Sequence, residues 1–204
     1  MTKKHTKLRG PTKAETAKLP PFQGITPEQI VVPKTQAECQ NAVDEIVSAG
    51  VTGFDTEARP TFQAGQKSNG PHVVQFALTD KAFIFQLHRS ECQKAAADLI
   101  SSNTLLKVGF GLRNDHKQIR HRLAIALNHV VDLDQVFRKL GYGGQIGIRG
   151  AVGVLFKQRF KKSKSTTTSN WARPELTPRQ ILYAANDAYA ALKIREALEK
   201  EGHL

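Results

Sequence analysis

The sequence has little cysteine, no long apolar run and a shortage of acidic residues. Its 204 residues include only two cysteines, Cys39 and Cys92, whose separation matches no metal-binding spacing, so we expect a reducing compartment and no disulfide framework. No apolar run approaches the ~18 residues of a membrane-spanning helix. The basic N-terminus is followed by no apolar segment, which argues against a secretory signal. We therefore expect a cytoplasmic protein with no membrane partner.

The shortage of acidic residues leaves a strongly basic chain. Lysine and arginine number 30 against 18 aspartates and glutamates, a formal net charge of +12. Basic residues gather in two clusters, one in residues 1–18 and one in residues 157–173, and the second contains no acidic residue. Clustered positive charge favours a polyanionic partner such as nucleic acid. A face that only confers solubility is the alternative for either cluster.

The length and composition predict one folded domain preceded by an arm. Hydrophobic residues make up 40% of the chain, which is ordinary for a globular protein with a sizeable core. Residues 1–25 are polar, basic and rich in proline, and we expect them to form a flexible N-terminal arm. Residues 26–204 then form the domain.

The domain is predicted to alternate strands and helices after an opening helix. Strands are expected over residues 51–57, 72–78, 82–87, 105–110 and 130–133, and helices over 35–48, 90–101, 112–127 and 177–201. One or two short helices are expected within residues 134–160, and a basic loop over 161–169. This order predicts an α/β fold with a mixed five-stranded sheet flanked by helices. The long loop 58–71 directly follows the first strand, where loops often gate a site.

Two carboxylates lie at the end of the first predicted strand. Because side chains alternate across a strand, Asp55 and Glu57 project from one face, about 7 Å apart along the chain. Neighbouring like charges repel, and a hard divalent cation is the simplest agent that makes the pair favourable. An ordinary solvated turn is the alternative, so the metal interpretation requires partners elsewhere.

A lone carboxylate interrupts the apolar part of the last predicted helix. Asp187 is the only charged residue between Ile181 and Leu192, and Tyr183 lies one turn earlier on the same helix face. A carboxylate on an apolar face is costly unless something compensates it. A metal ion or a hydrogen bond from a neighbouring backbone group would do so, and both interpretations stay open.

A fourth carboxylate follows the predicted strand 105–110. Asp115 falls on the buried stripe of the next helix, near the carboxyl end of the strand, where α/β proteins place their sites. Together, Asp55, Glu57, Asp115 and Asp187 would bring a charge near −4 into one place, which requires about two divalent cations. Two-metal sites carry out in-line phosphodiester chemistry. The phenol of Tyr183 would orient or deprotonate the attacking water.

These carboxylates lie in motifs that resemble those of the DEDDy 3′–5′ exonucleases, the group containing ribonuclease D and the Werner-syndrome exonuclease domain. The first three motifs are Phe54–Glu57, Val108–Asp115 and Tyr183–Tyr189. The Tyr-x-x-x-Asp spacing of the third motif marks the tyrosine subgroup. Residues 169–177 resemble the approach to that motif, with one residue fewer between Trp171 and Arg173. The ordered set spans roughly residues 30 to 200.

The resemblance implies an RNase H-like fold and a metal-dependent 3′–5′ exonuclease. Such an enzyme hydrolyses phosphodiester bonds of DNA or RNA from single-stranded 3′ ends and releases 5′-mononucleotides by a two-metal mechanism. The resemblance implies that Asp55, Glu57 and Asp187 hold one Mg²⁺ or Mn²⁺. It further implies that Asp55 bridges to a second ion, that Asp115 supports this ion through water, and that Tyr183 positions the nucleophilic water. A non-catalytic nucleic-acid-binding module on an exonuclease scaffold is the alternative.

Several other polar or aromatic residues near the motifs receive less specific predictions. Lys161, Lys162 and Lys164 are predicted nucleic-acid contacts, and Lys164 matches a lysine usual in the family, although a merely solvated loop is the alternative. Trp171 is interpreted as a packing anchor rather than a base-stacking platform. Asp132 and Asp134 are interpreted as structural. The motifs do not distinguish DNA from RNA, and they indicate no protein partner, oligomeric state or pathway.

Overall fold

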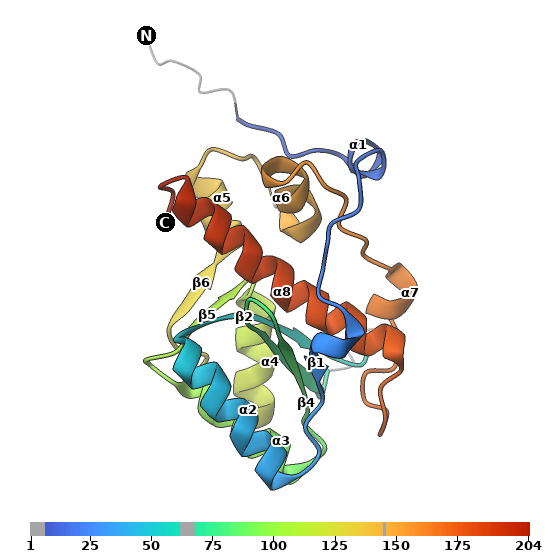
Figure 1. Ribbon diagram of the computed structural model, residues 1–204, viewed down its shortest axis with the longest axis vertical. Helices are drawn as coiled ribbons and strands as arrows, with labels where there is room; N and C mark the ends of the chain where they lie inside the picture. Colours follow the sequence, from blue (N-terminus) through green and yellow to red (C-terminus); the bar gives the residue numbers. More distant parts are fainter. Residues whose placement is uncertain (1–6, 62–67, 145) are drawn as a thin grey trace.

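A computed structural model describes residues 7–61, 68–144 and 146–204 and has a six-stranded sheet at its centre (Figure 1). In spatial order the strands are β1 (Ile30–Val31), β4 (Ala82–Gln86), β3 (Val73–Ala77), β2 (Val51–Glu57), β5 (Leu106–Gly109) and β6 (Val130–Asp132). The β2–β3 and β3–β4 pairs are antiparallel, and the β1–β4, β2–β5 and β5–β6 pairs are parallel. The predicted mixed α/β sheet is therefore confirmed.

The sheet has one strand more than the five predicted, because β1 adds an edge strand. Ile30 and Val31 pair with Ala82 and Phe83 of β4. The sequence did not predict this strand, since two residues are too few to show alternation. Pro33 follows at once, and proline cannot donate to a sheet ladder.

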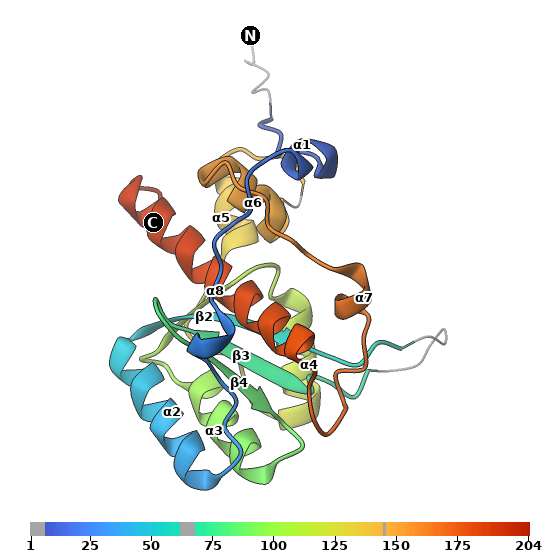
Figure 2. The same ribbon diagram turned by 45° about the vertical axis from the view of Figure 1, so that its right-hand side comes forward.

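Helices cover both faces of the sheet (Figures 1 and 2). Below it in these views lie α2 (Gln36–Ala49), α3 (Ser90–Ser101) and α4 (Arg113–Leu123). Above it, α8 (Pro178–Lys200) runs across the strands, accompanied by α5 (Leu133–Lys139), α6 (Gly147–Leu155) and α7 (Lys164–Thr167). The long helices begin where the sequence predicted, because Thr35 and Thr177 each form a capping box.

The lower layer is an apolar core built on aromatic side chains of the sheet. Phe54, Phe76 and Phe85 are fully buried. The centroid of the Phe76 ring lies 5.5 Å from that of Phe54 and 5.7 Å from that of Phe85. Cys39 of α2 and Cys92 of α3 belong to this core, with their Sγ atoms 3.1 Å apart as free thiols. Both cysteines are buried.

The segment before β1 lies along the domain. Its backbone forms isolated bridges between Leu8 and Tyr142 and between Pro21 and Arg159, and residues 13–17 form the short helix α1 (Lys13–Ala17). A single turn of 3-10 helix, η1 (Pro27–Gln29), leads into β1. Residues 7–25 therefore differ from the flexible arm that their composition indicated, because their backbone groups find partners on the domain. The domain boundary at residue 25 stays a prediction.

Trp171 has the packing role that the sequence predicted. Trp171 is 1% exposed and donates its indole N–H to the Thr167 carbonyl, 3.2 Å away, which confirms a packing anchor.

The gating role predicted for loop 58–71 falls partly on residues 62–67, which lie outside the described residues. None of the helices in the described residues is both long and apolar enough to cross a membrane.

Candidate active site

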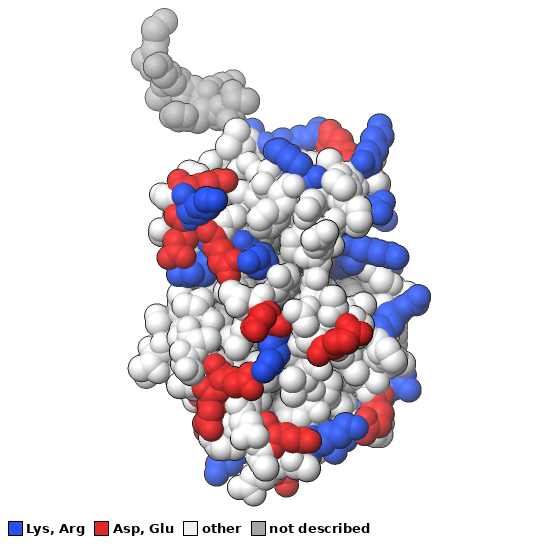
Figure 3. Space-filling view, in the orientation of Figure 1, with Lys and Arg blue, Asp and Glu red and all other residues white. Residues whose placement is uncertain are grey.

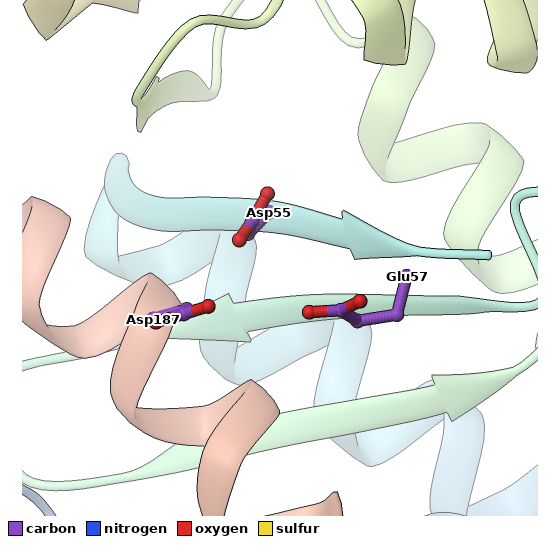
Figure 4. A group of neighbouring side chains, drawn as sticks. All are labelled: Asp55, Glu57 and Asp187. Atoms are coloured by element: carbon purple, nitrogen blue, oxygen red, sulfur yellow. The ribbon is translucent and has the colours of Figure 1, made fainter. Parts of the chain in front are cut away.

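Three of the predicted carboxylates meet between β2 and α8. Each of Asp55, Glu57 and Asp187 offers one oxygen atom, and these atoms lie within 4.8 Å of one another. Figure 4 shows all three side chains directed into the space between the strand and the helix. The alternation of β2 places Asp55 and Glu57 on one face, and α8 carries Asp187 across that face.

The close approach of α8 to β2 brings Asp187 to the strand. Gly53 lies directly beneath the helix, and a Cβ atom added there would be 1.9 Å from the backbone oxygen of Ala188. Ala184, Ala185 and Ala188 are fully buried along the same contact. Small residues on both elements therefore set the distance between the carboxylates.

The three carboxylates are electrostatically unfavourable by themselves. Burial raises the pKa of Asp55 well above its ordinary value, and the nearby Asp115 and Asp187 raise it further. Burial, followed by the charge of Asp55, raises the pKa of Glu57 from 4.5 to about 10. Burial also raises the pKa of Asp187. Such shifts are expected where carboxylates share a site built for a cation.

The oxygens of this cluster fit a divalent metal ion. The side chain of Asp187 is 1% exposed, and within the described chain its Oδ1 accepts no hydrogen bond, while its Oδ2 has the Lys162 ammonium 2.9 Å away. Unsatisfied buried acceptors are costly, and carboxylate oxygens at this spacing are the ligands that Mg²⁺ and Mn²⁺ prefer. Asp55, Glu57 and Asp187 are therefore the residues that would hold a metal ion.

A lysine predicted to bind nucleic acid lies against the carboxylates. The Nζ atom of Lys162 is 2.9 Å from Oδ2 of Asp187 and 5.6 Å from the centre of the Tyr183 ring. Burial acts to lower its pKa, but the attraction of Asp187 and Asp55 outweighs this and raises it. The ammonium thus partly neutralises the cluster. The sequence contained no signal for this position, since Lys161 and Lys162 are adjacent and alike.

Tyr183 lies beside Asp187 as a neutral phenol. Its hydroxyl is 2.8 Å from the hydroxyl of Thr167, on α7. Burial and the charge of Asp187 raise its pKa above the ordinary value. Of the two roles considered from the sequence, these surroundings favour orienting a water over deprotonating it, because little phenolate forms at neutral pH. Thr167 was missed in the sequence, where it is one of several hydroxyl residues.

Asp115 lies near the three carboxylates but outside their group. Its Oδ1 accepts a hydrogen bond from the hydroxyl of Thr56, which projects from β2 on the face opposite to Asp55 and Glu57. Burial raises the pKa of Asp115. Of the four carboxylates that were predicted to converge, three therefore lie in close contact and the fourth, Asp115, is held beside them.

Hydrogen bonds to Asp132 hold the turn that precedes Asp115. The two carboxylate oxygens of Asp132 accept hydrogen bonds from the backbone N–H groups of Gly111 and Leu112, at 2.8 and 3.0 Å. These bonds fix the turn that leads into α4. The structural role predicted for Asp132 is confirmed, and it serves the site. The helix itself ends at Leu123, four residues before the predicted end, because Ala124 adopts a left-handed conformation with φ of 56°.

The other predicted nucleic-acid contacts lie on the surface near the site. Lys161 is exposed beside Lys162, and Lys164 is exposed at the first position of α7. Figure 3 shows Lys and Arg side chains following the edge of the molecule formed by the N-terminal segment and α7. This distribution suits a phosphate backbone, and the contacts of Lys161 and Lys164 with nucleic acid stay predictions.

Comparison with known proteins relates this geometry to a family. A family model described as 3′-5′ exonuclease matches residues 30–203. The chain is 30% identical over 183 residues to the bifunctional 3′-5′ exonuclease/ATP-dependent helicase WRN of Mus musculus, covering 86% of this chain and 13% of the relative. It is 28% identical over 149 residues to a 3′-5′ exonuclease of Arabidopsis thaliana, covering 72% and 52%. The chain thus spans about half or less of the length of these curated relatives.

Solved structures share the fold. The Nibbler EXO domain of Aedes aegypti superimposes with a TM-score of 0.73 at 18% identity, covering 88% of this chain and 92% of that chain. RNase D of Trypanosoma brucei gives 0.73 at 20% identity, covering 83% and 64%. The predicted RNase H-like fold is confirmed by this similarity.

Proposed function

The chain belongs to the 3′–5′ exonuclease family, and on that basis we propose that it hydrolyses phosphodiester bonds from the 3′ end of single-stranded DNA or RNA. The products are 5′-mononucleotides, and the cofactors are two divalent ions, Mg²⁺ or Mn²⁺. Membership of this family confirms both the resemblance inferred from the motifs and the predicted enzyme class.

The observation that carries this proposal is the convergence of Asp55, Glu57 and Asp187 within 4.8 Å. Three carboxylates with raised pKa values favour a bound cation over the empty cluster. Bound metal ions would supply an activated water and neutralise the developing charge on the phosphate.

The chain's own residues then have distinct roles. Asp55, Glu57 and Asp187 would hold the first ion, and Asp55, whose pKa is raised by the charge of Asp115, would reach the second. Thr56 keeps the Asp115 side chain beside them. The hydroxyl of Tyr183, held by Thr167, orients the attacking water. Lys161 and Lys164 bind the phosphate backbone of the strand.

The decisive experiment is the shortening of 5′-labelled oligonucleotides in the presence of Mn²⁺. We expect single-nucleotide steps from the 3′ end, and an Asp55→Asn variant should lose activity by more than about a thousandfold, since metal ions contribute several kcal/mol to such reactions. Asp98→Asn, which removes an exposed carboxylate of α3, is the matched control and should retain activity.

Comparing matched ribo- and deoxyribo-oligonucleotides in the same assay determines the substrate class, because only RNA offers a 2′-hydroxyl. Full activity in Asp55→Asn would contradict the proposed site. Binding of oligonucleotides without shortening, in either metal, would identify the chain as the non-catalytic module instead.

A further inference from the structure

A large cavity lies beside the candidate active site, between the N-terminal segment, α7 and α8. Its volume is about 790 Å³, within the roughly 300–1,000 Å³ typical of small-ligand sites. Tyr183 and Asp187 line it as well as belonging to the catalytic cluster. The cavity is therefore continuous with the place where a strand end would be cleaved.

The wall opposite α8 comes from a segment that the family model does not cover. The model begins at residue 30, whereas Pro21, Phe22, Gly24, Ile25 and Pro27 line the cavity. One wall of the cavity therefore lies outside the residues that the family model matches.

Specific contacts hold that segment in place. The backbone N–H of Ile25 donates to Oδ1 of Asn186 on α8 at 3.1 Å, and the N–H of Phe22 donates to the Arg159 carbonyl at 3.0 Å. A Cβ atom added to Gly24 would lie 1.7 Å from the same Asn186 oxygen. The segment and the helix are thus in direct contact, and the cavity has a built wall.

The lining of the cavity combines apolar and cationic groups. Phe22, Phe160 and Leu182 contribute apolar surface, and Leu182 is 36% exposed. Lys161 and Arg179 lie at its exposed rim, and among the described residues neither forms a salt bridge with an acidic side chain. Asp187 of the catalytic cluster is the one acidic residue in the lining. Apolar and aromatic surface beside free cations suits a nucleobase with its phosphate.

We propose that this cavity is a subsite for one unpaired nucleotide of the single-stranded substrate. The base lies against Phe22 and Leu182, and the adjoining phosphate contacts Lys161 and Arg179. The inference rests on the proposed nucleic-acid substrate and extends it, because it assigns a binding role to residues before the range that the family model matches. A strand held in this way is positioned relative to Asp187 by a base as well as by its backbone.

The test is a scan with abasic nucleotides. Binding of a short labelled single-stranded oligonucleotide is measured by fluorescence anisotropy in EDTA, where hydrolysis does not proceed. A single abasic nucleotide is placed at successive positions counted from the 3′ end. For the unmodified protein we expect one position to weaken binding about tenfold, as loss of one base–aromatic contact does, and the other positions to change it little.

Substitutions in the cavity should erase that position dependence. Leu182→Glu places a carboxylate in the cavity, and Val47→Glu, at an exposed apolar position of α2, is its matched control. Gly24→Val displaces the opposite wall and should have the same effect as Leu182→Glu. Arg179→Glu should weaken binding about tenfold more than Lys94→Glu, which makes the same charge change on α3.

The outcomes separate this subsite from the proposed catalysis. A flat abasic profile in the unmodified protein, or a profile unchanged by both Leu182→Glu and Gly24→Val, overturns the subsite. If the profile is as expected while Mn²⁺ supports no shortening of the strand, the subsite stands and the exonuclease proposal fails. Thermal unfolding of each variant distinguishes lost binding from lost folding.

Discussion

The two faces of β2 differ in what they bury. On one face Phe54 is fully buried and contacts Phe76 within an apolar core shared with α2, α3 and α4. On the other face Asp55 and Glu57 lie under α8 with raised pKa values, beside Asp187. The face of Phe54 thus stabilises the fold. The face of Asp55 and Glu57, which we call the costly face, lowers the free energy of unfolding when no cation is bound.

This difference shows how the fold tolerates a costly site. The aromatic core beneath β2 stabilises the strand through buried apolar area, and it holds the backbone against the repulsion of the carboxylates above. On the core side of the strand, Thr56 holds Asp115 of α4 by a hydrogen bond. The carboxylate face gains stability only when a cation is present.

The largest expected effect comes from replacing one carboxylate of the costly face, Glu57. Glu57→Gln should lower exonuclease activity by more than about a thousandfold, because a metal ligand is lost. The same change should raise the melting temperature of the metal-free protein at neutral pH, since glutamine removes the cost of taking up a proton at this position on folding. Oligonucleotide shortening and calorimetry measure both effects.

The opposite signs of these two effects are the diagnostic result, because stability and activity are expected to diverge at a functional site. Asp98→Asn, away from β2, should change neither quantity. A destabilised metal-free Glu57→Gln protein would contradict the view that this face is unfavourable without a cation.

The second prediction concerns the contact that creates the costly face. Gly53→Val should lower the free energy of unfolding by about 3 kcal/mol, because the new side chain would meet the Ala188 backbone, which is 1.9 Å from a Cβ at that position. Activity should fall as well, since α8 must move away and carry Asp187 with it. Denaturant unfolding and the shortening assay provide the measurements.

A substitution on the stabilising face is the control. Phe54→Leu should cost about 1–3 kcal/mol of stability, because it shortens a fully buried side chain, while leaving activity in place at temperatures where the protein is folded. Equal loss of activity per unit of lost stability in both variants would show that Gly53 has no particular role in placing Asp187.

The third prediction is a pH dependence confined to the metal-free protein. The pKa of Glu57 is raised from 4.5 to about 10, so between these values the folded protein holds a proton that the unfolded chain has released. Stability is therefore present at low pH and is lost as pH rises through this window. Between pH 5 and pH 8 we expect the melting temperature to fall by about 5 °C or more.

Saturating Mn²⁺ should remove most of that dependence, because the bound ion favours the ionised carboxylates. Glu57→Gln should reduce it without metal. A metal-free melting temperature that rises over the same pH range would contradict the assigned pKa direction.

The smallest expected effect tests the lysine that contacts the carboxylates of the costly face. Lys162 lies 2.9 Å from Asp187 Oδ2, so its ammonium competes with a metal ion for the same oxygen. Lys162→Met should tighten Mn²⁺ binding about tenfold, equivalent to about 1.4 kcal/mol. Isothermal titration calorimetry measures the affinity without any nucleic acid. Lys161→Met is the matched control, and weaker Mn²⁺ binding by Lys162→Met would contradict the competition.

Much of the architecture could be predicted because it depends on local patterns. The alternation of β2, the β3–β4 hairpin and the capping box at Thr177 involve residues close in sequence, whose periodicity indicates their structure directly. Asp187 was recognisable because a lone carboxylate on an apolar helix face needs compensation. The edge strand β1 was missed because two residues carry no periodicity.

The sequence by itself determined the mixed α/β fold, the identity of the four carboxylates and the family to which their motifs belong. Only the tertiary structure decided that three carboxylates converge while Asp115 is held by Thr56, that Lys162 rather than Lys161 meets Asp187, and that residues 21–27 wall a cavity. Side-chain type and spacing are local properties, so they can be read along the chain. The convergence of three carboxylates depends instead on how closely α8 approaches Gly53, and that distance results from packing between elements far apart in sequence.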